Sequence, residues 1–176
     1  MKTLPQRLLI GILLGAALLG GIGSALWTQD SQAPAKPSLG GDFTLQSNIG
    51  PVALSDFRGK LVMIFFGYTH CPDVCPVTLA NVKVALKQLP PEQAQQVQTL
   101  FISVDPERDN VEHLAAYVDF FDKRFIGLTG SKAEIDQIIR QYGGFYRLVE
   151  TPESAMAYTV DHSSRLYLLD KNGQIA

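Results

Sequence analysis

The sequence predicts an α/β domain with a mixed central sheet flanked by helices, behind an N-terminal transmembrane helix. Uninterrupted apolar runs, such as LVMIFF at residues 61–66, predict strands that are buried on both faces. These runs alternate along the chain with segments whose apolar residues recur at helical spacing, which is the pattern of α/β folds. An uncharged apolar stretch at residues 8–27 predicts the transmembrane helix.

The composition limits the classes of function. Fifteen Lys and Arg against seventeen Asp and Glu give a net charge of −2, so the chain lacks the basic excess of a nucleic-acid-binding surface. Two cysteines exclude a disulfide-dense scaffold and a four-cysteine zinc ribbon. We therefore expect no nucleic-acid partner, and the two cysteines are the main candidates for chemistry.

The apolar stretch is long enough for a helix to cross a hydrocarbon core of roughly 30 Å. Lys2 and Arg7 precede it and Asp30 follows it, so the positive-inside rule predicts a cytoplasmic N-terminus. We predict that residues 1–27 are this N-terminus with a single-pass membrane anchor. Residues 28–41 are polar and rich in Pro, Gly and Ala, which indicates a flexible linker.

A cleaved signal peptide is the alternative interpretation, because Gly23-Ser24-Ala25 could serve as a cleavage site. The apolar run is longer than that of a usual signal peptide, which favours the anchor. Under both interpretations the rest of the chain is exported across the membrane. The segment is not of the Arg- and Ser-rich type that targets organelles, so we predict a bacterial inner-membrane protein whose domain, residues 42–176, is periplasmic.

The exported domain is predicted to begin with a β-hairpin, since residues 42–46 and 52–54 flank the turn Asn48-Ile49-Gly50. The buried strand at residues 61–66 comes next. The apolar spacing of residues 77–89 then predicts a helix, which the following pair of prolines stops.

A second buried strand, TLFISV at residues 99–104, precedes a helix at residues 111–121. Asn110 is the expected N-cap of this helix, because its side-chain oxygen can accept from a free backbone N–H of the first turn. A short strand at residues 125–128 follows.

Ser131 and Glu134 predict a capping box at the start of a helix that extends to Tyr142. Three strand-like segments and a tight turn complete the chain, at residues 145–150, 157–160, 166–169 and 171–173. This order, with a cysteine-bearing loop between a central strand and a helix, is the layout of a thioredoxin-like fold. Because that fold normally adds a final strand and helix after such a turn, we expect a truncated form.

The cysteines lie in the segment GYTHCPDVCP at residues 67–76, where open α/β sheets place their functional sites. If the first helical turn includes both cysteines, Cys71 and Cys75 share one face of a helix. If Pro76 is instead the first helical residue, they lie in a tight loop above the helix N-terminus. Both arrangements bring the sulfurs together near a helix dipole, which favours thiolates.

Paired thiolates either exchange with disulfides or bind soft metals. Redox proteins of this fold usually carry Cys-x-x-Cys, whereas here three residues separate Cys71 from Cys75. A purely structural disulfide is a third interpretation, but so short a loop constrains the unfolded chain little. The cysteines alone leave these alternatives open.

A histidine could complete a metal site. His162 lies just before the last central strand, in the loop that faces the cysteine loop in a thioredoxin-like layout, where thioredoxins place a proline. Two thiolates and an imidazole suit copper as Cu(I) or Cu(II), and zinc could use the same donors. His70 could tune Cys71 or bind metal, but it and His113 also fit solvated positions. Candidate residues to orient the imidazole or balance its charge are Asp73 and Asp161.

Three motifs, in the same order, closely resemble the Sco/SenC family of cytochrome oxidase assembly proteins. They are GYTHCPDVCP (residues 67–76), ISVDPERD (102–109) and YTVDHSSRLYLLDKNG (158–173). The match extends over the exported domain from about residue 41. The predicted membrane anchor also fits this family.

The resemblance implies a thioredoxin-like, membrane-anchored copper metallochaperone with Cys71, Cys75 and His162 as metal ligands. It implies that the partner is the copper-bearing subunit of cytochrome c oxidase, whose copper A site the protein helps to assemble. The family also performs thiol–disulfide chemistry on the cysteines of its target or of other partners. The alternative function is therefore a membrane-tethered thiol–disulfide oxidoreductase that uses the redox pair Cys71 and Cys75 without metal.

Overall fold

The computed structural model describes residues 39–176, which form one compact unit. The predicted anchor and most of the predicted linker lie outside the described residues. Within the described part of the chain, no helix combines the length and apolarity that crossing a membrane requires.

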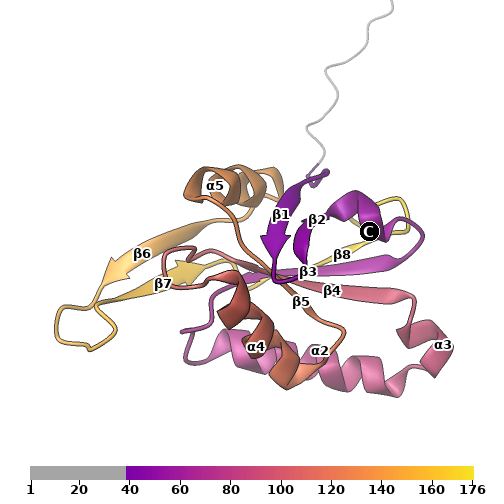
Figure 1. The fold of residues 1–176 in the computed structure, drawn as a ribbon, viewed down its shortest axis with the longest axis horizontal. Helices are drawn as coiled ribbons and strands as arrows, with labels where there is room; N and C mark the ends of the chain where they lie inside the picture. The colour runs from indigo at the N-terminus through magenta and orange to yellow at the C-terminus, as the bar shows by residue number, and fades with distance from the viewer. Residues whose placement is uncertain (1–38) are drawn as a thin grey trace, which may run out of the picture. The chain divides into compact units, whose positions relative to one another are not determined.

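A four-stranded mixed sheet forms the centre of this unit, in the order β5–β4–β3–β8 (Figure 1). β3 pairs in parallel with β4 and antiparallel with β8, and β5 continues the parallel part beside β4. This confirms the predicted mixed α/β sheet. The strands are β3 (Leu61–Gly67), β4 (Val97–Ser103), β5 (Ile126–Leu128) and β8 (Leu166–Leu169).

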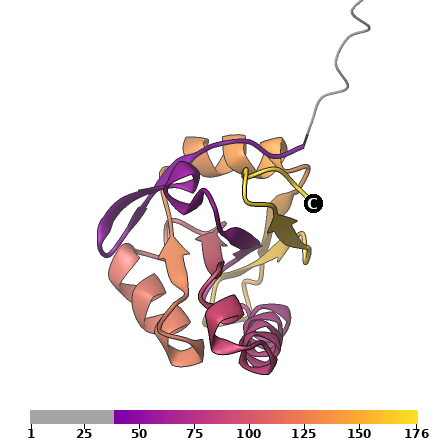
Figure 2. The same cartoon turned by 90° about the vertical axis from the view of Figure 1, so that its right-hand side faces the viewer.

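The central position of β3 follows from its sequence. Ile64, Phe65 and Phe66 are completely buried, although successive side chains point to opposite faces of the sheet. Such a strand needs cover on both faces. Two helices, α2 (Val74–Gln88) and α4 (Val111–Phe121), cover one face, and α5 (Lys132–Gln141) covers the other (Figures 1 and 2).

The predicted caps are present. The Asn110 side chain accepts a hydrogen bond from the backbone N–H of His113 at the start of α4. Ser131 and Glu134 form the capping box at the start of α5. The predicted N-terminal hairpin is also confirmed as β1 (Thr44–Ser47) and β2 (Gly50–Ala53).

The two strands after α5 do not join the central sheet. β6 (Tyr146–Glu150) and β7 (Tyr158–His162) form a separate antiparallel hairpin, which extends to one side of the sheet in Figure 1. The sequence predicted both strands but not their separation from the sheet. β7 also continues two residues beyond its predicted end, so His162 is the last residue of a strand and not part of a loop.

Helix α2 differs from its prediction in a way that matters for the cysteines. It begins at Val74 and not at residue 77, so Cys75 is its second residue while Cys71 lies in the preceding loop. Pro76 occupies the third helical position, where its missing N–H costs no intrahelical hydrogen bond. Two short helices were not predicted: η1 (Leu54–Phe57) and α3 (Pro91–Ala94).

Candidate metal centre

The two cysteines follow the carboxyl end of β3. A turn closed by the hydrogen bond from the Cys71 N–H to the Tyr68 carbonyl (3.2 Å) brings Cys71 back over the start of α2. Cys71 is only 9% exposed and Cys75 is completely buried. Both are free thiols. The cysteine loop therefore packs at the edge of the hydrophobic core, and Cys71 lies nearer to solvent than Cys75.

Gly67, the last residue of β3, makes this arrangement possible. A Cβ atom added there would lie 2.7 Å from the Cys75 sulfur and 2.7 Å from the Phe101 ring, closer than such atoms approach one another. Its φ is not in the left-handed region, so the close approach alone selects glycine. The sulfur of Cys75 thus packs directly against the end of the central strand.

His162 reaches the same place from the hairpin. Its Nε2 atom lies 3.4 Å from the Sγ atom of Cys75, and its Nδ1 atom lies 3.1 Å from the carbonyl oxygen of Ser163. A carbonyl can only accept, so Nδ1 donates this hydrogen bond and Nε2 is the ring nitrogen that faces the sulfurs. The imidazole also makes T-shaped contacts with the rings of Phe65 and Tyr68, at 6.0 and 5.8 Å between centroids.

The donor atoms of Cys71, Cys75 and His162 all lie within 4.8 Å of one another. Sulfur and nitrogen donors that share one ion bind it at about 2.0–2.3 Å, so they can be at most about 4.6 Å apart. A small closure of the group therefore suffices for all three to contact one soft ion. Among residues 39–176, this is the single cluster of at least three metal-ligating side chains that meets the 4.8 Å limit.

The environment favours one thiolate. The pKa of Cys71 is lowered to about 4, mainly because Cys75 offers it a hydrogen bond, and further because His162 and backbone N–H groups do so. The pKa of Cys75 is raised, since its proton is held in that hydrogen bond and the residue is deeply buried. At neutral pH the pair is thus a thiolate and a thiol that share one proton.

The site opens to solvent on one side through a pocket whose lining includes Tyr68, Cys71, Val160 and His162. Both acids named from the sequence, Asp73 and Asp161, also line it. Asp161 pairs with Arg147 at 2.7 Å on the exposed outer edge of the hairpin, so its carboxylate is directed to that partner. Asp73 is the N-cap of α2 and contributes a backbone N–H to Cys71.

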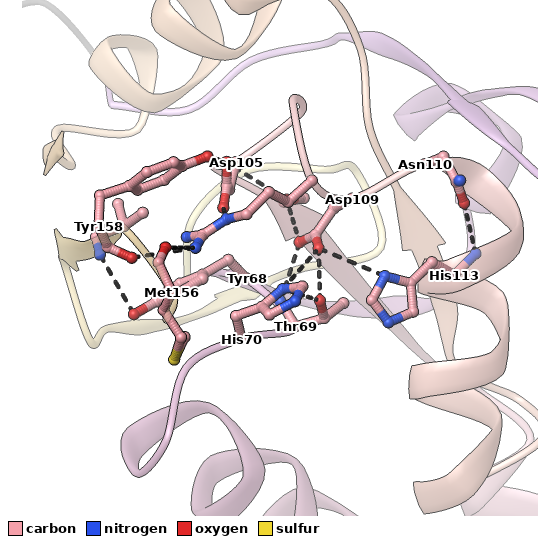
Figure 3. Close-up of polar contacts among 12 residues, drawn as sticks. Tyr68, Thr69, His70, Asp105, Asp109, Asn110, His113, Met156 and Tyr158 are labelled. Atoms are coloured by element: carbon pink, nitrogen blue, oxygen red, sulfur yellow. Dashed lines mark hydrogen bonds and ion pairs between the residues drawn. The ribbon is translucent and has the colours of Figure 1, made fainter. Parts of the chain in front are cut away.

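The other two histidines lie together elsewhere. His70 and His113 flank the buried carboxylate of Asp109, and their ring centroids are 5.7 Å apart (Figure 3). Their Nδ1 atoms lie 3.9 and 4.0 Å from its Oδ1 atom. Both rings are half-exposed and outside the cysteine–histidine cluster. The structure thus favours solvated positions for both histidines over a role of His70 at the cysteines. Their contact with the buried carboxylate of Asp109 was not predicted.

The comparisons with known proteins agree with the motifs in the sequence. The SCO1/SenC family model matches residues 31–176. The mitochondrial SCO2 homologue of Bos taurus is 42% identical over 97% of this chain and 67% of its own length. The chain belongs to the SCO1/SenC family. The predicted family is therefore confirmed.

Solved structures of SCO1/SenC proteins have the same fold. Bradyrhizobium japonicum ScoI with copper bound is 39% identical, with a TM-score of 0.73 over 79% of this chain and 87% of that chain. BsSco, in which a disulfide switch was identified, is 25% identical with a TM-score of 0.57 over 84% and 85% of the two chains. It is described as a member of the Sco family of cytochrome c oxidase assembly proteins. The predicted thioredoxin-like Sco fold is thus confirmed.

Sequence reasoning missed several residues around the SCO1/SenC site. Tyr68 contributes a wall of the pocket, and the Ser163 carbonyl selects the tautomer of His162. The position of Tyr68 inside the segment GYTHCPDVCP, three residues before Cys71, was a usable signal. No sequence pattern identifies a backbone carbonyl as the partner of an imidazole, because every residue carries one.

Proposed function

We propose that this SCO1/SenC protein is a copper metallochaperone that binds the ion through Cys71, Cys75 and His162. The observation that carries the proposal is the convergence of the two sulfurs and an imidazole nitrogen of His162 within 4.8 Å. Thiolates suit Cu(I), and the imidazole helps to retain Cu(II). The copper bound to the related Bradyrhizobium japonicum ScoI supports copper over zinc as the ion.

The copper ion is the cargo of this site. The low pKa of Cys71 supplies one thiolate without a preceding deprotonation, and Cys75 releases its proton when the ion replaces it. The backbone bond from His162 Nδ1 keeps Nε2 available as the third donor. The open side of the pocket leaves room for a thiolate of the recipient, so the ion can pass by ligand exchange.

The same pair couples copper loading to redox state. Oxidation of Cys71 and Cys75 to a disulfide releases two electrons to an oxidised acceptor, with loss of the remaining thiol proton, and removes both sulfur donors. The loaded and oxidised forms therefore exclude each other. The disulfide switch identified in the related BsSco supports such a coupling.

We further propose that residues 1–27 anchor the protein in a bacterial inner membrane, that residues 28–41 are the tether and that residues 42–176 work on the periplasmic side. The partner is the copper-bearing subunit of cytochrome c oxidase, and the description of BsSco as an oxidase assembly protein supports this choice. Anchoring both proteins in one membrane raises their effective concentration for each other.

A competition titration of the reduced full-length chain against a colorimetric Cu(I) chelator tests the ligand set. His162→Ala is expected to weaken Cu(I) binding by about tenfold or more and to remove the nitrogen donor from the X-ray absorption spectrum. His113→Ala is the matched control, because this imidazole is outside the cluster, and it should bind as the wild type does. Equal affinities and spectra for wild type and His162→Ala would disprove the assignment.

The second candidate function is a thiol–disulfide oxidoreductase that needs no metal. The low pKa of Cys71 favours it, since a thiolate attacks disulfides at neutral pH. In this case the reduction of a disulfide substrate by metal-free protein survives His162→Ala and is lost in Cys71→Ser. A wild-type protein that binds copper but reduces no disulfide excludes this function.

A further inference from the structure

The segment Asp105–Asp109 makes hydrogen bonds both to the residues that precede the cysteine loop and to the β6–β7 hairpin that carries His162. Cys71 belongs to a loop packed into the core, whereas His162 belongs to a hairpin that pairs with no strand of the central sheet. Some other part of the chain must therefore fix the distance between them. Asp105 and Asp109 are almost completely buried, at 2% and 0% exposed, as expected of charged groups with structural partners.

Arg108 joins this segment to the start of β7, and its partners Asp105, Met156 and Tyr158 are labelled in Figure 3. Its Nη1 atom donates to the carbonyl oxygens of Tyr158 (3.1 Å) and Met156 (3.3 Å), and its Nε atom donates to the carboxylate of Asp105. One planar guanidinium thus bonds to a buried carboxylate on one side and to the hairpin backbone on the other. Lysine cannot reproduce this, because it lacks the rigid fork of donors.

Aromatic contacts hold the same guanidinium in place. Its Cζ atom lies 3.7 Å from the centroid of the Tyr158 ring, and the Tyr158 hydroxyl donates to Asp105 at 2.8 Å. The centroid of the Tyr68 ring lies 5.7 Å from the same Cζ atom. Cation–π contacts of this kind strengthen when they are shielded from water, and the Arg108 side chain is only 17% exposed.

Tyr68 carries the connection on to the metal ligand. Its hydroxyl accepts a hydrogen bond from the backbone N–H of Val160 at 3.3 Å, and its ring makes a T-shaped contact with the His162 imidazole. Arg108 and Tyr68 therefore hold alternate positions of β7, at Tyr158 and Val160. His162 is the next residue in this alternation and points to the same face of the strand.

Asp109 holds the other half of the site. Its carboxylate accepts from the backbone N–H of Thr69 (3.0 Å), from the Thr69 hydroxyl and from the Ser103 hydroxyl (2.7 Å). Thr69 lies two residues before Cys71, so these bonds fix the start of the cysteine loop. Asp105, Arg108 and Asp109 thus connect both halves of the centre through one short segment.

We propose that Arg108 is a positioning residue that holds the β6–β7 hairpin so that the imidazole of His162 reaches the sulfurs. In this arrangement, Asp109 fixes the cysteine loop and Arg108 fixes the hairpin, so residues 105–109 act as a brace that sets the ligand spacing. The inference rests on the proposed three-ligand site. It adds a residue whose contacts are with Asp105, Tyr68 and the hairpin and not with the three ligand side chains, but which determines whether His162 can bind the ion.

A double-mutant cycle on the full-length chain tests this role. Cu(I) affinity is measured by chelator competition for wild type, Arg108→Met, His162→Ala and the double variant. Arg108→Met is expected to weaken binding about tenfold, and the loss should be nearly absent when His162 is already alanine. Arg108→Lys should resemble Arg108→Met. Additive losses in the double variant, or full affinity in Arg108→Lys, would overturn the proposal.

A second readout needs no metal. Hydrogen exchange of the copper-free protein should become faster at the amides of β6 and β7 in Arg108→Met, and stay unchanged in β3 and β4. Tyr158→Phe, which removes only one hydroxyl, should show the same pattern to a smaller extent and covers the case in which Arg108→Met does not fold. Unchanged exchange in the hairpin of both variants would overturn the brace. If the wild type binds no copper, the proposed function fails while this measurement still decides the brace.

Discussion

The Nε2 atom of His162 lies 3.4 Å from the Sγ atom of Cys75, although the two residues are 87 positions apart in the chain. The contact joins a buried position at the start of α2 to the last residue of a hairpin outside the central sheet. It is therefore the point at which two separately supported parts of the domain form one centre.

Replacing Cys75 with alanine is expected to raise the pKa of Cys71 from about 4 toward that of an ordinary thiol. The reason is that the hydrogen bond from Cys75 is the largest cause of the lowered value. The rate of Cys71 alkylation by iodoacetamide as a function of pH measures this, because only the thiolate reacts. Cys75→Ser is the control, since its hydroxyl can still donate. Identical pH profiles for wild type and Cys75→Ala would contradict the expectation.

The reduced cysteine pair should make the free energy of unfolding fall both when the pH is lowered and when it is raised from an optimum. Cys71 has a folded pKa below its unfolded value of about 8.5, so its contribution is present above that value and is lost as the pH falls toward about 4. Cys75 has a raised pKa, so its contribution is present below about pH 8.5 and is lost above it.

The stabilisation from the pair is thus expected to be largest near pH 8.5, to within about one unit. Urea unfolding of the reduced chain against pH, compared with the variant in which both cysteines are serine, measures it. A difference between the two proteins that does not vary from about pH 5 to about pH 10 would show that the cysteines do not titrate as described.

Removal of the Asp109 carboxylate should destabilise the fold strongly. Asp109→Ala leaves the buried hydroxyl of Ser103 and the N–H of Thr69 without their acceptor, which costs about 3 kcal/mol of unfolding free energy. Asp119→Ala is the matched control, because its pair with the exposed Lys123 contributes about 0.5 kcal/mol or less. Urea unfolding distinguishes them, and similar losses for both variants would refute the buried role of Asp109.

Gly67→Ala should damage both the fold and copper binding, because the added methyl group collides with the Cys75 sulfur and the Phe101 ring. Gly127→Ala is a matched collision at a distance from the site, against Leu114 of α4. Both variants are expected to lose about 1–3 kcal/mol of stability. Only Gly67→Ala should also weaken Cu(I) binding in a chelator competition. Equal copper affinity in the two folded variants would contradict the close packing of Cys75 described above.

Deletion of residues 1–27 is expected to move the protein from the membrane fraction to the soluble fraction of bacterial cells. Fractionation followed by immunodetection measures this, and the full-length chain is the control. Sequencing of the mature N-terminus separates the anchor from a cleaved signal peptide. An N-terminus that begins after residue 25 would favour the signal peptide.

The sequence predicted the sheet well because its strands are strongly apolar. Residues 61–66 lie in β3 and residues 99–103 in β4, and both strands are central, as uninterrupted apolar runs require. The start of α2 was placed three residues late, at residue 77 and not at Val74. Proline is favoured at the first helical position, and here it occupies the third, which propensity alone does not distinguish.

The three site residues were predicted correctly as neighbours, but what supports them was not. Cysteine and histidine are recognisable because few other side chains share their chemistry. Arg108 and Asp109 were visible only as members of the family motif at residues 102–109. Their partners include backbone atoms of Met156, Tyr158 and Thr69, whose proximity depends on the tertiary fold and leaves no trace in local sequence.

The separation of the β6–β7 hairpin from the central sheet has an evolutionary consequence. The exposed side chains of the hairpin are those of Arg147, Leu148, Glu150 and Asp161, so substitutions at these four positions leave the hydrophobic core intact while they can shift the position of the imidazole. Selection can therefore change the copper affinity of the site without loss of fold stability. Chains with the same core can in this way become matched to recipient proteins that bind copper more or less tightly.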